Sequence, residues 1–268
     1  MRGVILAGGF GSRMQPSTKV TNKHLLPVYS EQGAIPMLFY PIHTMVSSGI
    51  EDILIISSRE HCGHIIENLS DGQDFGADFS FKVQDLQHVQ LGIASALKLA
   101  KNFTNNEKFA VCLGDNFFED SFSEEVKNFE CQWPSEPLTH GIVLDRYKAA
   151  VFLKEVDDVR RFGCATLDAA DRVVKIVEKP GVPESNLAVT GLYFYTHEVY
   201  DVADELKPSA RGELEITHIN DHYCQEGTAV GYMLEGHWSD MGVPTSMTRV
   251  QEWIAKNDFT IGKTEAVT

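Results

Sequence analysis

The stretch Val4-Ile5-Leu6-Ala7-Gly8-Gly9-Phe10-Gly11-Ser12-Arg13-Met14-Gln15-Pro16 organises this chain. Residues 4–7 form an unbroken apolar run, which is typical of a central strand in a parallel sheet that is covered on both faces. Three glycines follow within four positions, and glycine permits a positive φ and a close approach of the backbone to a ligand. Exposed backbone N–H groups at such a turn form a hollow that binds anions, and the guanidinium of Arg13 suits phosphate. The stretch therefore predicts a phosphate-binding loop, of the kind that binds nucleotides.

Two well-known phosphate loops do not fit these residues. A dinucleotide motif G-x-G-x-x-G that starts at Gly9 requires glycine at position 14, where the chain has Met14. This mismatch disfavours a nicotinamide-dependent oxidoreductase. A P-loop requires Gly-Lys followed by Ser or Thr, and none stands in the loop after the first strand; Gly262-Lys263-Thr264 has neither a glycine five residues before Gly262 nor a strand before it. An ordinary strand-to-helix turn that contains glycines is the alternative interpretation.

The composition narrows the class of protein. With 268 residues, 43% of them apolar and 23% charged, the chain is typical of an ordinary globular protein with one large domain. Its formal net charge of −15 argues against a general nucleic-acid binder, because such binding depends on Lys and Arg that neutralise phosphates. Any anionic ligand must therefore be bound by a local basic site.

The cellular location is predicted from the cysteines and from the absence of a leader pattern and of a long apolar run. We find no secretory leader pattern at Met1 and no run near the roughly 18 apolar residues that a membrane span needs. The five cysteines lie far apart without a C-x-x-C pair, which favours reduced and mostly buried thiols; they are Cys62, Cys112, Cys131, Cys164 and Cys224. We therefore expect a cytoplasmic protein without a membrane partner.

Strands and helices alternate through the first half of the chain. The patterns predict strands at 4–7, 53–56, 79–83 and 109–113, and helices at 38–50, 65–69 and 92–100. This alternation predicts βαβ units and a parallel sheet. Ligands bind beyond the carboxyl ends of the strands in such sheets, so residues 8–13, residues 84–92 and Asp115 should lie on one rim.

The second half of the chain has a different pattern. Strands are expected at 165–167, 173–177, 189–195 and 230–234, with helices at 213–225 and near 247–254. We predict an antiparallel, substrate-binding part followed by a C-terminal helix. The whole chain, residues 1–268, is then a single domain: a nucleotide-binding half over about 1–130, a substrate-binding half over about 150–240 and a C-terminal helix over about 243–257.

A few polar residues stand where they could carry chemistry. Asp115 directly follows a strand, Asp240 comes much later, and Mg²⁺ prefers one or two carboxylate ligands from the protein. A turn or cap residue is the alternative for each carboxylate. Lys179 would direct an ammonium group toward the rim, and the amide of Gln84 could pair with a pyrimidine base. Both side chains would otherwise simply be solvated.

Eight blocks stand in a fixed order along residues 1–255. They are Leu6-Ala7-Gly8-Gly9-Phe10-Gly11-Ser12-Arg13-Met14, Lys23-His24-Leu25-Leu26-Pro27-Val28, Leu113-Gly114-Asp115-Asn116, Phe162-Gly163, Glu178-Lys179-Pro180, Val189-Thr190-Gly191-Leu192-Tyr193-Phe194-Tyr195, Ser209-Ala210-Arg211-Gly212-Glu213-Leu214-Glu215-Ile216-Thr217 and Trp238-Ser239-Asp240. In this order they resemble the motifs of the sugar-1-phosphate nucleotidylyltransferases, and most of all those of the glucose-1-phosphate thymidylyltransferases. The resemblance implies a Rossmann-like, mostly parallel sheet flanked by helices, with an antiparallel sugar-binding part.

The resemblance also implies roles for the matching residues. The nucleoside triphosphate would be bound by Leu6, Ala7, Gly8, Gly9, Gly11, Ser12, Arg13 and Lys23, and its base by Gln84 and Gly92. The sugar phosphate would be bound by Phe162, Gly163, Glu178, Lys179 and Val189. Asp115 and Asp240 match the ligands of Mg²⁺, the expected cofactor. With Arg13, Lys23 and Lys179 they make up the expected catalytic group.

The implied reaction is the attack of a sugar-1-phosphate oxygen on the α-phosphorus of a nucleoside triphosphate, with release of pyrophosphate. The favoured substrates are dTTP and glucose 1-phosphate. Such a step needs positioning and charge neutralisation and no nucleophilic side chain. Members of the family often form homo-oligomers, so a homo-oligomer is also expected.

Three departures from the family pattern leave alternatives open. Residues 84–96 are longer than the usual base-binding loop and lack its proline, and residues 133–148 form an added segment. Met241 replaces a usual threonine, and the chain stops soon afterwards without a longer helical tail. Other nucleotides (UTP, CTP, GTP), another sugar 1-phosphate, or a catalytically silent regulatory relative are the alternatives. The silent relative is disfavoured because all five expected catalytic residues are present.

Overall fold

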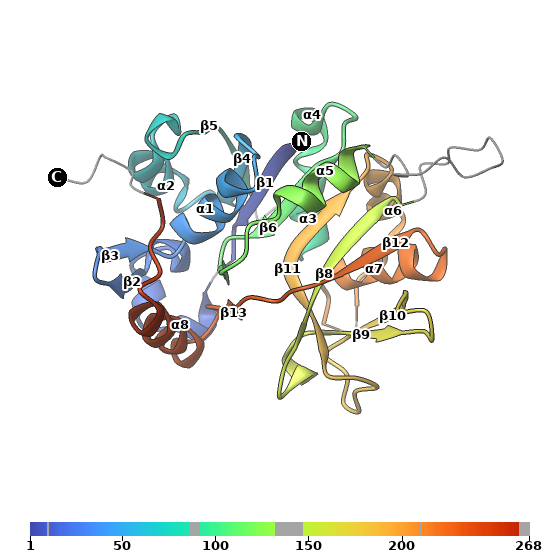
Figure 1. The fold of residues 1–268 in the computed structure, drawn as a ribbon. Coiled ribbons are helices and arrows are strands. Elements are labelled where there is room, and N and C mark those ends of the chain that lie inside the picture. Colours follow the sequence, from blue (N-terminus) through green and yellow to red (C-terminus); the bar gives the residue numbers. More distant parts are fainter. Residues whose placement is uncertain (10, 86–91, 132–146, 210, 263–268) are drawn as a thin grey trace.

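The computed structural model describes residues 1–9, 11–85, 92–131, 147–209 and 211–262 (Figure 1). Most strands of this part join one sheet of nine strands, whose parallel part has the order β6, β1, β4, β5. These strands are β1 (Arg2–Ala7), β4 (Asp52–Ser58), β5 (Asp78–Gln84) and β6 (Phe109–Leu113). The predicted α/β fold with a mostly parallel sheet is confirmed.

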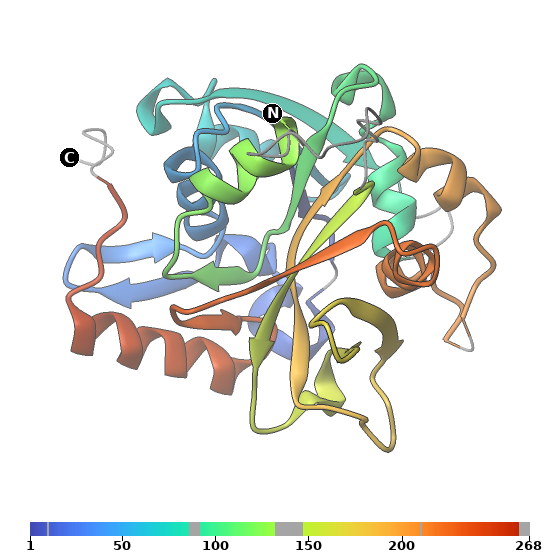
Figure 2. The same cartoon turned by 45° about the vertical axis from the view of Figure 1, so that its right-hand side comes forward.

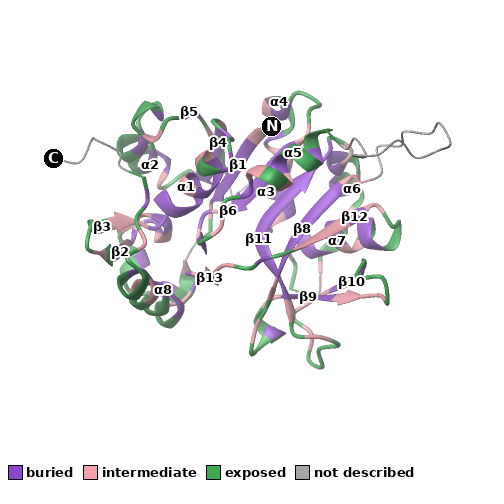
Figure 3. Cartoon of the chain, viewed as in Figure 1, coloured by how far each residue is buried: buried purple, intermediate pink, exposed green. Residues whose placement is uncertain are grey.

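Strand β1 lies at the centre of the parallel part and is buried on both faces. Ile5 and Ala7 belong to one apolar cluster, and Val4 and Leu6 belong to another on the opposite face. Helix α1 (Phe39–Ser47) contributes side chains to the first cluster and α3 (Ile93–Lys98) to the second. Figure 3 shows buried residues concentrated in the central strands. The apolar run at residues 4–7 is therefore a covered strand, as predicted.

The second half extends the same sheet through β11 (Leu187–Tyr195), which pairs antiparallel with β6. It continues with β8 (Ala149–Glu155), β9 (Gly163–Leu167), β10 (Val173–Glu178) and β12 (Ala229–Met233). The antiparallel prediction is confirmed for β9, β10 and β11. It is wrong for β12, which pairs parallel with β8. Two helices precede β12, α6 (Val199–Glu205) and α7 (Ile216–Gln225), so it is reached by a crossover and not by a hairpin.

Several elements have no counterpart in the sequence prediction. They are the hairpin β2 (Pro27–Ser30) and β3 (Gly33–Pro36), the ribbon β7 (Asn116–Phe118) and β13 (Trp238–Asp240), and the helices α4 (Lys101–Thr104) and α5 (Ser123–Cys131). The helix predicted at 65–69 is present as α2 (Cys62–Leu69) and begins three residues earlier. Short 3-10 helices include η1 (Ser12–Met14), η3 (Lys23–Leu25) and η5 (Val159–Arg161).

The last helix, α8 (Pro244–Asn257), returns to the first half of the molecule and packs against β2 (Figure 2). Beyond it, Gln32 and the backbone of Ile261 exchange two hydrogen bonds at 3.0 and 3.1 Å. The C-terminal helix is thus present as predicted, and it packs against the half that is earlier in sequence.

Two predicted features lie partly outside the described residues. These are the long loop after Gln84, of which 86–91 are not described, and the added segment at 133–148, of which only 147 and 148 are described. The five cysteines carry free thiols, and only Cys131 is exposed. Within the described ranges, no helix has the length and apolarity that crossing a membrane requires.

Candidate active site

A cleft of about 580 Å³ opens at the carboxyl ends of β1, β5 and β6. It brings together the glycine-rich loop, Gln84 and Asp115, as the parallel-sheet rule predicts, and its other wall comes from the second half of the chain. The predicted site residues that line it are Leu6, Gly8, Gly9, Gly11, Ser12, Arg13, Lys23, Gln84, Gly92, Asp115, Phe162, Gly163, Glu178, Lys179, Val189 and Asp240. Ala7 does not line the cleft, because its side chain is fully buried in β1.

The glycine-rich loop needs its glycines for two different reasons. Gly11 has a φ of 62°, in the left-handed region, and a Cβ there would lie 2.8 Å from the Thr18 methyl group. Thr18 also donates a hydrogen bond to the Gly11 carbonyl at 2.7 Å. At Gly8, a Cβ would lie 2.7 Å from Gln84 Oε1, so the bare backbone lets the Gln84 amide rest against the loop.

Lys23 and Asp115 form a largely buried ion pair, with 2.6 Å between Nζ and Oδ2. Burial alone would raise the pKa of Asp115. The charge of Lys23 and the hydrogen bonds that Asp115 accepts lower that pKa to about 2. The neighbouring His24 is buried, and burial together with Lys23 lowers its pKa to about 3. The Asp115 carboxylate is therefore ionised at neutral pH beside an uncharged imidazole.

The ribbon of β7 and β13 brings Asp240 to Asp115. Asp240 pairs in register with Asn116, the residue after Asp115. The position that a Cβ would take at Gly242 lies 3.1 Å from Asp240 Oδ2 and 3.4 Å from Asp115 Oδ2. Arg13 Nη2 lies 3.2 Å from the same position, so the two carboxylates and this guanidinium surround one small space beside Gly242. Burial and the charge of Asp115 raise the pKa of Asp240.

This pair of carboxylates fits a Mg²⁺ ion. Mg²⁺ takes one or two protein carboxylates and completes its shell with water and substrate phosphates. Burial is the main cause of the raised pKa of Asp240 and the charge of Asp115 is the second, so a cation between the two carboxylates would offset their repulsion. Among the residues that the structure describes, no cluster of three or more His, Cys, Asp or Glu could hold a metal ion.

On the opposite wall, Glu178 is the centre of a hydrogen-bonded group at the end of β10. It accepts from Lys179 Nζ at 2.7 Å, from Thr217 Oγ1 at 2.6 Å and from Arg211 Nη2 at 3.1 Å. Burial would raise the pKa of Glu178, but Lys179 and Thr217 bring it below its usual value. Lys179 has a φ of 43°, and such backbone strain in a residue other than glycine is concentrated at functional sites.

The sequence prediction missed several residues of the cleft. Arg161 directly precedes the predicted Phe162-Gly163 pair, and its Nη2 lies 3.2 Å from Asp240 Oδ1. Arg211 lies before α7 and pairs with both Glu178 and Glu215. Arg211 could have been predicted, because it lies inside one of the eight blocks that resemble family motifs. Nothing in the local sequence pattern indicated Arg161.

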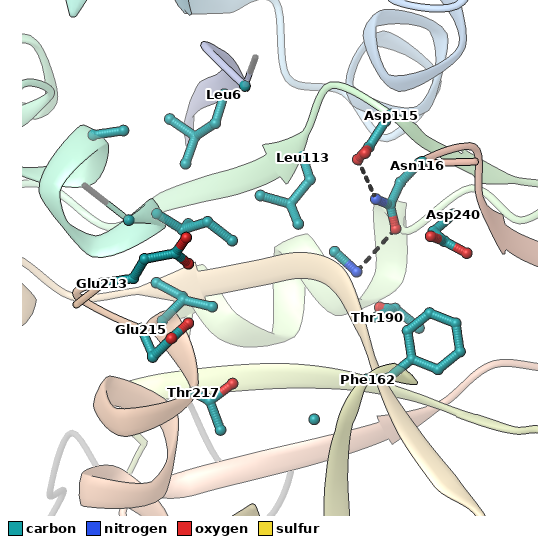
Figure 4. A pocket seen from close by; sticks show the side chains of 18 of the residues that line it. Leu6, Leu113, Asp115, Asn116, Phe162, Thr190, Glu213, Glu215, Thr217 and Asp240 are labelled. Atoms are coloured by element: carbon teal, nitrogen blue, oxygen red, sulfur yellow. Dashed lines mark hydrogen bonds between the residues drawn. The ribbon is translucent and has the colours of Figure 1, made fainter. Parts of the chain in front are cut away.

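The cleft has two ends, and acidic side chains stand at both of them. Figure 4 shows Asp115, Asn116 and Asp240 at one end and Glu213, Glu215 and Thr217 at the other, with Phe162 and Thr190 below the first group. Basic side chains line it in spite of the net charge of −15; they are Arg13, Lys23, Arg161, Lys179 and Arg211. The same cleft is lined by five carboxylates, those of Asp115, Glu178, Glu213, Glu215 and Asp240. An anionic ligand would therefore meet basic side chains that stand among acidic ones.

The chain belongs to the nucleotidyl transferase family, whose model matches residues 2–257, and it is a nucleotidyltransferase. It is 38% identical to the glucose-1-phosphate thymidylyltransferase of Neisseria meningitidis, over 95% of this chain and 82% of that one. A Bacillus anthracis crystal structure, provisionally named a glucose-1-phosphate thymidylyltransferase and bound to sucrose, is 41% identical with a TM-score of 0.85 and covers 98% of both chains. A UDP-glucose pyrophosphorylase complexed with UDP-glucose has the same fold, with a TM-score of 0.78 at 21% identity over 96% of this chain and 98% of that one.

Proposed function

We propose that this chain transfers a thymidylyl group from dTTP to glucose 1-phosphate, which yields dTDP-glucose and pyrophosphate. The observation that carries the proposal is one cleft lined by basic residues from both halves of the chain, with Asp115 and Asp240 facing each other in it. Two phosphorylated substrates need two such sets of cations. The choice of dTTP and glucose 1-phosphate is supported by the similarity to several glucose-1-phosphate thymidylyltransferases.

The glycine-rich loop binds the triphosphate in this proposal. Its backbone N–H groups, with Arg13 and Lys23, contact the phosphates and stabilise the negative charge of the departing pyrophosphate. The base then lies near Gln84, whose amide rests against the loop. That amide can accept from the N3–H of thymine and donate to its O4.

The second half binds the sugar phosphate. Lys179 and Arg211 offer cations to its phosphate, and Glu178 holds both in place. In the structure these cations are paired with carboxylates of the same cleft, as Lys23 is with Asp115. The phosphates of the substrates replace or share these partners when they bind. Phe162, Gly163 and Val189 line the neighbouring wall where the sugar ring would lie.

The chemical step is a direct displacement. A phosphate oxygen of glucose 1-phosphate forms a bond to the α-phosphorus as the bond from that phosphorus to the bridging oxygen of pyrophosphate breaks. The attacking oxygen is already ionised at neutral pH, so no general base is required. Asp115 and Asp240 would hold Mg²⁺, which when bound offsets negative charge at the α-phosphate. Most of the remaining rate acceleration comes from the positioning of the two substrates.

The test is a panel of substrate pairs. Four nucleotides (dTTP, UTP, CTP, GTP) are combined with the 1-phosphates of glucose, galactose and mannose, and pyrophosphate release is measured with and without Mg²⁺. We expect the highest kcat/KM for dTTP with glucose 1-phosphate, and no release without the metal.

Two outcomes would contradict the proposal. A clear preference for another pair would leave the reaction class in place and replace the substrates. No release with any pair would contradict the reaction itself and favour the silent regulatory relative.

A further inference from the structure

Asn116 connects three separate parts of the chain at the Asp115–Asp240 end of the cleft. Its side chain is buried, with 2% of its surface exposed. Its Nδ2 donates to Asp115 Oδ1 at 3.1 Å, while its Oδ1 accepts from the backbone N–H of Gly191 at 3.0 Å and from Trp238 Nε1 at 2.8 Å (Figure 4). Figure 4 draws the first two of these bonds, and the third is to Trp238, outside that view. One amide therefore contacts a carboxylate, strand β11 and strand β13.

The contact with β11 falls at a break in the sheet. Residues 188 and 189 of β11 pair with β9, and residues 192–195 pair with β6, so Gly191 lies between the two ladders. The register with β8 also shifts between Val189 and Tyr193. A buried N–H at such a break needs another acceptor, and Asn116 Oδ1 provides it. A Cβ at Gly191 would lie 2.5 Å from Asn116 Nδ2, so a side chain there is incompatible with this contact.

The contact with β13 fixes the second carboxylate. Trp238 and Asp240 lie two residues apart on this short strand, and Asp240 is the register partner of Asn116. The hydrogen bond from Trp238 Nε1 to the Asn116 side chain therefore fixes the position of β13 relative to β7. The two carboxylate oxygens of Asp115 have different partners: Oδ1 accepts a hydrogen bond from Asn116, and Oδ2 accepts one from Lys23.

We infer that Asn116 is a positioning residue, which orients the Asp115 carboxylate toward a divalent cation and links it to β11 and to the strand of Asp240. Hydrogen-bond partners of ligating carboxylates fix their orientation, and removing such a partner typically lowers metal affinity by about 10- to 100-fold. The importance of that metal for turnover rests on the proposed function, whereas the effect on metal binding does not.

A purely structural role is the competing explanation, since Asn116 also satisfies a buried backbone N–H. Asn220 provides a matched control, because it is buried to the same degree and its Oδ1 accepts a hydrogen bond from the Tyr195 hydroxyl. Asn220 does not line the cleft. Replacing either asparagine with alanine removes buried hydrogen bonds, but only one replacement affects Asp115.

The test measures binding of Mn²⁺, used as a paramagnetic probe for Mg²⁺, to the free protein by electron paramagnetic resonance. We expect Asn116→Ala to raise the Kd for Mn²⁺ at least about tenfold. The variant Asp115→Asn, which removes a proposed ligand, is the reference and should also raise this Kd. Asn220→Ala should keep the Mn²⁺ Kd within about twofold of the wild type, although it also lowers the unfolding temperature. If Asn116→Ala does not fold by circular dichroism, Asn116→Ser is measured in its place.

A wild-type Kd for Mn²⁺ in the Asn116 variant would overturn the inference, as would an equal loss in Asn220→Ala or a wild-type protein that does not bind Mn²⁺. The substrate panel separates this result from the proposed function. If Asn116→Ala loses Mn²⁺ affinity but no substrate pair reacts with the wild type, the positioning role stands and the proposed reaction fails.

Discussion

At the scale of single residues, the cleft is an arrangement of ion pairs that substrates would rearrange. Lys23 pairs with Asp115, Arg161 with Asp240, and Lys179 with Glu178, so each cation has a carboxylate partner before any phosphate arrives. The sequence could indicate most of these residues because each stands at a strand end or in a matching block. It could not indicate the pairings, because those depend on how distant segments fold together.

Lys179 allows a direct test of the sugar-phosphate wall. We expect Lys179→Gln to raise the KM for glucose 1-phosphate by about 10- to 100-fold, because a charge-assisted hydrogen bond contributes about 1.5–3 kcal/mol. The KM for dTTP should change much less. Steady-state kinetics with each substrate varied in turn measure both values.

Lys175→Gln is the matched control for that variant. Lys175 lies on β10, the strand that ends just before Lys179, and pairs with Glu184 at 2.6 Å, but it does not line the cleft. Equal KM values in both variants and the wild type would show that Lys179 does not contact the sugar phosphate.

At the scale of elements, periodicity predicted the long strands and helices, and it failed for the short elements that build the site. The ribbon of β7 and β13 has three residues in each strand, too few for any period to be visible. Yet this ribbon places Asp240 opposite Asn116 and hence beside Asp115. The parallel pairing of β12 was also missed, because direction depends on the helices that precede a strand and not on its own residues.

The element η3 carries a buried titratable group, His24, whose ring Nδ1 contacts Asn22 Oδ1 at 2.7 Å. Its folded pKa of about 3 lies below the ordinary value of 6.5. As the pH falls below about 6.5, the unfolded chain takes up a proton that the folded chain does not, so the free energy of unfolding decreases. For one such group we expect a loss of about 2 kcal/mol between pH 6.5 and pH 5.

Urea unfolding of the wild type and of His24→Gln at these two pH values measures that loss. The variant should lose less stability than the wild type over this range, whereas a replacement of the exposed His64, His64→Gln, should behave as the wild type does. The same pH dependence in His24→Gln and the wild type would contradict the assignment of a buried neutral imidazole.

At the scale of the whole molecule, one sheet connects a half that binds the nucleotide and a half that binds the sugar phosphate in the proposed reaction. Strand β11 joins them, because it pairs with β6 on one side of the break at Gly191 and with β9 on the other. The order of the motifs was enough to predict the family and the type of fold. Base and sugar preference could not be predicted in the same way, because residues 84–96 depart from the family pattern.

The central claim is that the attack occurs at the α-phosphorus of the nucleotide, and the position of an isotopic label tests it most directly. The protein is incubated with Mg²⁺, glucose 1-phosphate and dTTP that is radiolabelled at either the α- or the γ-phosphate. The account predicts that the α-label appears in dTDP-glucose and the γ-label in pyrophosphate. Transfer of the γ-label to the sugar, its release as inorganic phosphate, or an α-label found in free dTMP or bound to the protein would contradict the account.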